Sequence, residues 1–231
     1  MQRSVSDMRN DFATTAPITA IIDIPAGRVR FIAADRPDTT VEVLPADAAK
    51  GRDVKLAEQT TVDYTDGVLR VATTTKSHQL IGPSGAVEVT VQLPAGSRVE
   101  AKAASAEFRA VGRLGDVTYE SSHGPIKIDE AASARLATQA GDVEVGRLTG
   151  PAEISTSKGD IHIAEAVRGT VVLRTKAGEI SVGAATGVSA SLDAGTSHGR
   201  IHNSLKNTEG ADAELTIHAT TAAGDITARS L

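Results

Sequence analysis

Between Val117 and Val182 the chain alternates apolar and polar residues in four similar units. Each unit has two short alternating runs that meet at a glycine, and these glycines lie 17, 18 and 19 residues apart: Gly124, Gly141, Gly159 and Gly178. Alternation with a period of two is typical of a strand with one buried face. In three units an acidic residue follows the glycine, which is typical of a tight turn. Each unit is therefore predicted to be a pair of strands around a turn.

Stacking of these units predicts an all-β fold. A lone hairpin of this length is marginally stable in water, whereas stacked copies cover each other's edges and continue one core. A period near 18 residues indicates a β-solenoid of single-stranded β-helix-like repeats. At the looser corner after each unit, Leu114, Leu148 and Val167 are expected to fill the core. We expect the first apolar residue of each second run to stack over its counterparts: Ile126, Val143, Ile161 and Ile180.

The pattern becomes irregular towards the C-terminus. Gly178 and Gly199 are 21 residues apart, and the next interval is 25 residues. Ser204–Glu214 is the longest insertion between units, and Asn203 replaces an inward apolar residue. We expect the last coil, which ends in Ile226–Leu231, to form a polar outer edge of the stack.

The chain divides into three regions by this pattern. Residues 1–16 are predicted to be a polar leader, 17–96 an N-terminal antiparallel β-sandwich-like cap, and 97–231 the β-solenoid repeat region. A cap is expected because a bare terminal coil exposes both core and unpaired backbone. No helix is predicted beyond one turn at Asp47–Lys50. The strands expected in the cap are Ile18–Ile24, Arg28–Ala33, Thr40–Leu44, Val54–Val62, Val68–Thr74 and Ala86–Leu93.

The glycine corners resemble those of a known family. The matching segments are Ala140-Gly-Asp-Val143, Lys158-Gly-Asp-Ile161, Ala177-Gly-Glu-Ile180 and Ala223-Gly-Asp-Ile226, together with the lead-in Leu93-Pro-Ala-Gly96. In these segments the chain resembles the DUF4097 (LiaG-like) adhesin-type family of β-strand repeat proteins, which is related to the DUF2807 adhesins. The resemblance covers roughly residues 18 to 231 and implies the same fold. The family carries no agreed catalytic residues, so the resemblance assigns none to this chain.

Composition narrows the function classes. The net charge is −5 and aromatic residues make up 2% of the chain. Nucleic-acid binding is not expected, because phosphate contacts need clustered positive charge and single-strand readers need stacking platforms. The absence of cysteine excludes disulfides and thiolate metal sites. No apolar run approaches the ~20 residues of a membrane span, and the N-terminus lacks the apolar segment of a signal peptide. We therefore expect no membrane insertion and a cytoplasmic location, although members of the resembled family are often exported.

Stacking would arrange the acids that follow the turn glycines as a ladder. Asp142, Asp160 and Glu179 are the candidate metal ligands. Like charges about 5 Å apart repel by roughly 1 kcal/mol, and oxygen ligands suit Ca²⁺. The competing interpretation is ordinary turn chemistry, with Lys158 and Lys176 close by in the sequence. We favour the second and predict no metal site, no cofactor and no catalytic residue.

Histidines and arginines also recur at fixed places in the repeat. His162 and His202 share one outward position, and His123 and His198 share the position before the glycine. Neither pair falls in adjacent coils, so solvated histidines are predicted instead of a metal cluster. Three arginines recur at the looser corner, where they form either a weak basic stripe or a solvated corner: Arg113, Arg147 and Arg168.

The sequence contains no nucleophile elbow, phosphate loop or zinc-binding helix. The expected function is non-enzymatic: an adhesin-type binding or structural protein whose sheets present Ser/Thr and charged side chains to an unknown protein or glycan. One alternative is an intracellular scaffold that forms homo-oligomers through the edges of the solenoid. A second alternative, by analogy with β-helices that cleave polysaccharides, is a polysaccharide-active enzyme.

Overall fold

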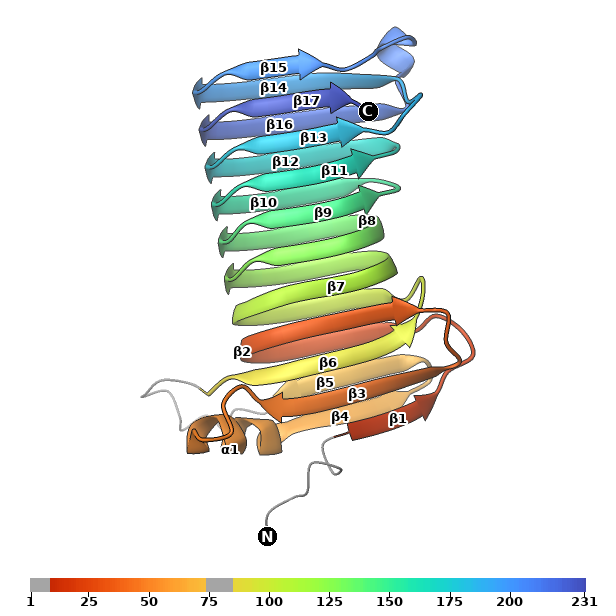
Figure 1. Cartoon of the computed structure of the whole chain (residues 1–231), viewed down its shortest axis with the longest axis vertical. Helices are drawn as coiled ribbons and strands as arrows, with labels where there is room; N and C mark the ends of the chain where they lie inside the picture. The colour runs from red at the N-terminus through yellow and green to blue at the C-terminus, as the bar shows by residue number, and fades with distance from the viewer. Residues whose placement is uncertain (1–8, 74–84) are drawn as a thin grey trace.

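The computed structural model describes residues 9–73 and 85–231. Its strands form one continuous network wound into an elongated solenoid (Figure 1). Each regular coil gives one strand to each of two stacks, and neighbouring coils pair in parallel. We call these stacks face A and face B. The predicted all-β solenoid is confirmed.

Two sets of strands build the two faces in the middle and at the C-terminal end. Face A contains the second half of β8 (Ile126–Ala140), β10 (Ala152–Lys158), β12 (Gly169–Ala177), β16 (Leu215–Ala223) and β14 (Ala190–His198). Face B contains the first half of β8, β9 (Val143–Leu148), β11 (Ile161–Ala166), β13 (Ile180–Ala184), β17 (Ile226–Ser230) and β15 (Ile201–Ser204).

The long strands β2 (Thr19–Ala34) and β7 (Arg98–His123) pass through both faces without a break. They pair in parallel from Thr19 against Arg98 to Ile32 against Val111. Parallel stacking therefore begins inside the region expected to be an antiparallel cap.

The aliphatic ladder lies as predicted. Ile126 is opposite Val143, Val143 is opposite Ile161, and Ile161 is opposite Ile180. All four side chains are buried. Period-2 alternation places one residue of each pair inside, and stacking then fills the space between the faces.

The looser corner differs from the prediction in one coil. Leu114 and Leu148 are buried there, and Leu148 lies opposite Ala131 and Ala166. In the third coil Ala166 takes the buried place, whereas Val167 is only half-buried. The prediction was wrong at Val167 because the strand continues to Ala166 before it turns.

The N-terminal end is closed by a cap of short antiparallel strands and one helix (Figure 1). β1 (Arg9–Ala13) pairs with β3 (Asp38–Pro45), and β3 pairs with β6 (Val87–Pro94), all antiparallel on face B. On face A, β4 (Thr60–Thr65) pairs antiparallel with β5 (Val68–Thr73). Residues 9–13 of the expected leader are thus a strand; residues 1–8 lie outside the described part.

Helix α1 (Gly51–Gln59) contradicts the expectation of a strand over Val54–Val62. Its buried residues, Asp53, Leu56 and Ala57, have helical spacing and cover the end of the core. Asp53 also accepts a hydrogen bond from the Ala86 backbone N–H at 3.0 Å. The alternation that suggested a strand continues only in Thr60–Thr65. Within the described residues, no helix is long and apolar enough to cross a membrane.

The order of coils in space differs from their order in sequence at both ends. Near the C-terminus, β16 lies between β12 and β14, and β17 lies between β13 and β15. Near the N-terminus, β2 lies between β7 on one side and β5 and β6 on the other. The expected outer edge at Ile226–Leu231 was therefore wrong, because β17 is paired on both sides. The outermost coil is β14 and β15, as Figure 1 shows.

Candidate functional site

The predicted acidic ladder forms, and its carboxylates bind backbone. Asp142 Oδ1 accepts a hydrogen bond from the Asp160 backbone N–H at 2.9 Å. Asp160 Oδ1 accepts one from the Glu179 N–H at 2.7 Å. Each aspartate thus satisfies a turn amide of the next coil. Charge-assisted bonds of this kind are stronger than neutral ones, so these aspartates join adjacent coils.

The same corners contain a glycine and a threonine that also join coils. Gly159 has φ +145°, and a Cβ built on it would lie 2.2 Å from the carbonyl oxygen of Gly141. Thr175 Oγ1 donates to the Gly159 carbonyl oxygen at 3.1 Å, and Thr156 and Thr221 make equivalent bonds. Only glycine allows this close approach of stacked backbones.

These contacts favour the turn interpretation of Asp142, Asp160 and Glu179 over cation binding. Within the described residues, no group of three histidine, aspartate or glutamate side chains is arranged to hold a metal ion. The structure also separates the histidines. Between the coils of His162 and His202 lie those of Ser181 and Thr227.

Two of the three recurring arginines belong to a ladder of alternating charge, whereas the Arg168 side chain donates to the Thr149 carbonyl oxygen at 3.3 Å. Arg113 is opposite Glu130, Glu130 is opposite Arg147, and Arg147 is opposite Glu165. The Arg147–Glu165 separation is 3.8 Å. Alternation of sign favours the solvated-corner interpretation over a basic stripe. It also favours the observed coil register, because like charges directly opposite each other are destabilising.

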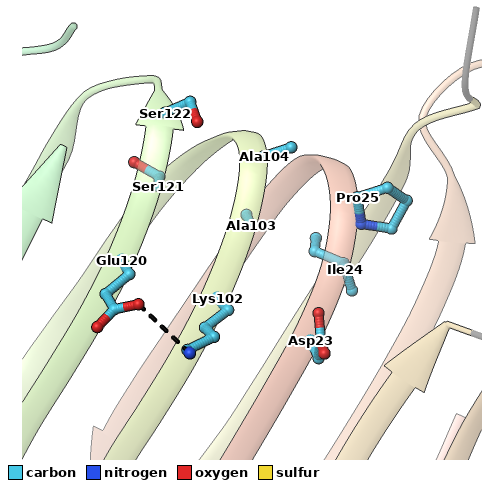
Figure 2. A pocket seen from close by; sticks show the side chains of 9 residues that line it. All are labelled: Asp23, Ile24, Pro25, Lys102, Ala103, Ala104, Glu120, Ser121 and Ser122. Atoms are coloured by element: carbon cyan, nitrogen blue, oxygen red, sulfur yellow. Dashed lines mark ion pairs between the residues drawn. The ribbon is translucent and has the colours of Figure 1, made fainter. Parts of the chain in front are cut away.

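We describe two of the shallow depressions on the described part of the solenoid surface. One, of about 390 Å³, lies at the end of the face A strands and is lined by small side chains and three charged ones (Figure 2). Two of these charges, Lys102 and Glu120, form an ion pair of 3.3 Å across it. The other, of about 420 Å³, lies at the start of the face A strands and includes Asp116 and Ser133. Their side chains hydrogen-bond at 2.6 Å. The Ser133 hydroxyl donates to the Asp116 carboxylate at an exposed site, and no histidine lines this depression.

The open end of the solenoid has a different character. β14 pairs only with β16, and β15 only with β17, among the described strands. Ile201 of β15 is 44% exposed, whereas its ladder neighbour Ile226 is 1% exposed. Leu192 and Ala194 of β14 are half-buried. We call the outward side of β14 and β15 the open end.

Backbone direction shows which amides of β14 face outward. The Leu215 N–H donates to the Ser189 carbonyl oxygen, which places the amides of Ser191 and Asp193 towards β16. The amides of Leu192 and Ala194 then face away from β16. Among the described residues, backbone covers only the start of the strand, where the Ala190 N–H donates to the Lys206 carbonyl oxygen at 3.0 Å.

An arginine–aspartate contact ties the outermost coil to the coil below. Asp225 Oδ1 accepts from the Arg200 backbone N–H at 2.9 Å, and Asp225 Oδ2 accepts from the Arg200 guanidinium at 3.0 and 3.2 Å. The backbone bond and then the guanidinium bond lower the pKa of Asp225 below its usual value. This is the acid–turn contact of the middle coils with an arginine added.

Sequence reasoning missed this end because it assumed that coils stack in chain order. Two signals were present. The inward residues of β14 are Ala190, Leu192 and Ala194, and they lie opposite Leu215, Ile217 and Ala219 of β16, so β14 has the smaller residue at its first inward position. Asn203 also occupies an inward place, which suits a coil with nothing above it.

Comparison with known proteins identifies the family. The family model described as Toastrack DUF4097 matches residues 21–230. A search of curated proteins finds no match. Solved structures with similar folds include a "putative adhesin" from Bacteroides fragilis, with 12% identity, a TM-score of 0.48, and 95% of each chain covered. Another is a "putative adhesin" from Parabacteroides distasonis, with 13% identity, a TM-score of 0.42, and 95% of each chain covered. A "putative cell adhesion protein" from Clostridium sporogenes has 12% identity and a TM-score of 0.39, with 96% of this chain and 99% of that chain covered.

Proposed function

The chain belongs to the Toastrack DUF4097 family, and from this premise we propose that it is a non-enzymatic binding module that holds a protein partner at its open end by strand pairing. The observation that carries the proposal is the unpaired side of β14, next to the exposed Ile201. An edge strand presents a row of free N–H and C=O groups, which a further strand can bind. The neighbouring apolar side chains would contribute burial to the same contact.

The two faces of the solenoid offer less to a ligand. All five aromatic side chains of the chain are buried or half-buried, so no aromatic platform is exposed for a sugar ring. Several charged groups on the faces lie opposite partners of the other sign, as with Lys127 and Glu144 at 2.8 Å, whereas Arg30 lies opposite Arg109. A protein strand is therefore the favoured ligand class over a glycan. This arrangement also supports a non-enzymatic role, because polar groups in the two depressions bind each other: Lys102 with Glu120, and Ser133 with Asp116. The cytoplasmic location stays a prediction.

A labelled peptide with the sequence of Leu215–Ala223 tests the proposal. This segment is the strand that β14 already binds on its inner side. Fluorescence anisotropy with dilute full-length protein should show saturable binding. Ala194→Pro should abolish it, because proline removes an outward amide while the bonds to β16 remain. Ala194→Ser keeps the amide and should bind like the wild type.

Two results would overturn the proposed function. One is the absence of binding by the wild-type protein up to the solubility limit of the peptide. The other is equal binding by the proline and serine variants, provided that circular dichroism shows both to be folded.

A further inference from the structure

We propose, resting on the proposed function, that the partner at the open end is a second copy of this chain. The two copies are related by a two-fold axis, and β14 of one pairs antiparallel with β14 of the other. A two-fold axis that brings two identical ends together makes the same strand antiparallel to itself, and both copies use the same surface. The solenoid then continues from one molecule into the next.

The sequence of β14 suits pairing with itself. Complete overlap of Ala190–His198 places Ala194 opposite Ala194 of the second copy. Asp193 is then opposite Gly195, and Leu192 is opposite Thr196. Inward residues meet inward residues, so the two cores join.

Charge disfavours one alternative register. Asp193 is the only acidic residue of β14, and the strand has no lysine or arginine. A shift that placed Asp193 opposite itself would set like charges about 5 Å apart. Full overlap avoids this repulsion and leaves space beside each aspartate, because nothing lies within 4 Å of a Cβ built on Gly195.

β14 also lacks the features that normally prevent edge strands from pairing with other strands. Lysine, proline and bulges protect edge strands from pairing. β14 has no lysine and no proline, and its register against β16 is continuous from Ala190 to Thr196. The Lys206 carbonyl covers the amide of Ala190, so the pairing runs through Leu192–Thr196.

At the opposite end β1 and β4 are also paired on one side only among the described strands, but both are short and carry charged side chains, which disfavour edge pairing: Arg9 and Asp11 in β1, and Asp63 in β4. There α1 buries Leu56 and Ala57 over the core, and the rings of Phe12 and Tyr64 meet with centroids 5.0 Å apart. A molecule with one open end forms a closed dimer, whereas two open ends would give a filament.

A pair of substitutions at Gly195 tests the register by analytical ultracentrifugation of the full-length protein. Gly195→Asp places an aspartate opposite Asp193 of the second copy twice in each dimer. The dimer dissociation constant should rise by roughly an order of magnitude. Gly195→Lys is the matched variant: it adds a side chain of the opposite charge at the same open position and should lower the dissociation constant. Combining Asp193→Lys with Gly195→Asp should restore association, and high salt should reduce all three effects.

The outcomes separate this inference from the proposed function. A wild-type protein that sediments as a monomer up to millimolar concentration overturns the inference. If that monomer still binds the strand peptide in a manner sensitive to Ala194→Pro, the proposed function stands without it. If neither self-association nor peptide binding occurs, both fall. A dimer with the same dissociation constant in Gly195→Asp and Gly195→Lys rules out this β14 register.

Discussion

The two ends of this solenoid differ in how their terminal coils are covered. Every stack of coils ends in a layer whose inner residues have no neighbour and whose edge has free hydrogen-bonding groups. At the N-terminal end, α1 buries Leu56 and Ala57 over the core, and antiparallel strands extend both faces. At the other end β14 and β15 are left uncovered among the described residues, with Ile201 44% exposed. The difference is that the first end closes the core, whereas the second leaves the edge on which the proposed strand pairing rests.

The glycines of the two ends should differ most in their tolerance of a side chain. Gly27, next to the cap, has φ +132°, and a Cβ there would lie 1.8 Å from the Val87 carbonyl oxygen. Gly27→Ala should cost about 3 kcal/mol or more, since backbone strain adds to overpacking. Gly195→Ala meets nothing within 4 Å and should stay within about 0.5 kcal/mol of the wild type. Urea unfolding monitored by circular dichroism measures both; equal costs would contradict the described packing.

The coil order gives the next largest contrast. Ile226 and Ile201 are ladder neighbours, but Ile226 lies one coil inside. Ile226→Ala should destabilise the protein by about 3 kcal/mol through transfer and cavity effects, whereas Ile201→Ala should cost less than about 1 kcal/mol. Chain-order stacking predicts the reverse, because the last coil in sequence would then be outermost. Denaturant unfolding of the two variants, measured at low protein concentration, decides between the two orders.

Local patterns were sufficient for the middle of the fold and insufficient for its ends. The stacking of Val143 over Ile126 follows from alternation and spacing alone, because each coil meets its immediate neighbour in sequence. Helix α1 was missed because the buried spacing of Asp53, Leu56 and Ala57 covers little more than one turn and runs into a real strand at Thr60. The position of the last coil in the stack depends on long-range packing. Of the two C-terminal coils, the one that fills the space beside β12 and β13 more completely takes that position.

The same distinction holds for the candidate site. Turn chemistry at Asp142 and Asp160 was foreseeable from the Gly-Asp corners, and the structure shows the backbone amides that these carboxylates bind. The open end at β14 was missed, because locating it requires the position of β16, which the alternation of apolar and polar residues does not give. An irregular interval between glycines can therefore signal a change in coil order as well as a surface loop.

Substitution of Tyr119, which lies nearer the closed end, should have a smaller effect on stability. Its hydroxyl donates to the Ala106 carbonyl oxygen at 3.2 Å, and burial raises its pKa above 10.0. Tyr119→Phe should cost about 1 kcal/mol at neutral pH through loss of this bond. A raised folded-state pKa means that the stabilising contribution is complete below pH 10 and falls as pH rises towards the folded value. The stability difference between wild type and variant should therefore shrink above pH 10, as measured by urea unfolding at several pH values. A difference that does not change with pH would show that Tyr119 ionises equally in both states.

Protonation of Asp225 on acidification should have the smallest effect on stability, and this effect should be confined to the open end. Its bonds to Arg200 hold its folded-state pKa below the usual aspartate value of 3.8. A lowered pKa means that the contact contributes fully well above pH 3.8 and is lost as pH falls through the lower, folded value. Hydrogen exchange should therefore show that the amides of β14 and β15 lose protection on acidification, while those of β10 to β13 keep theirs. Asp225→Asn retains an acceptor without the charge, so its end coil should exchange faster near neutral pH and respond less to acid. If acid opens the middle coils as readily as the outermost coil, the Arg200 contact does not specifically stabilise the outermost coil. The open end is then no less stable to acid than the middle of the solenoid.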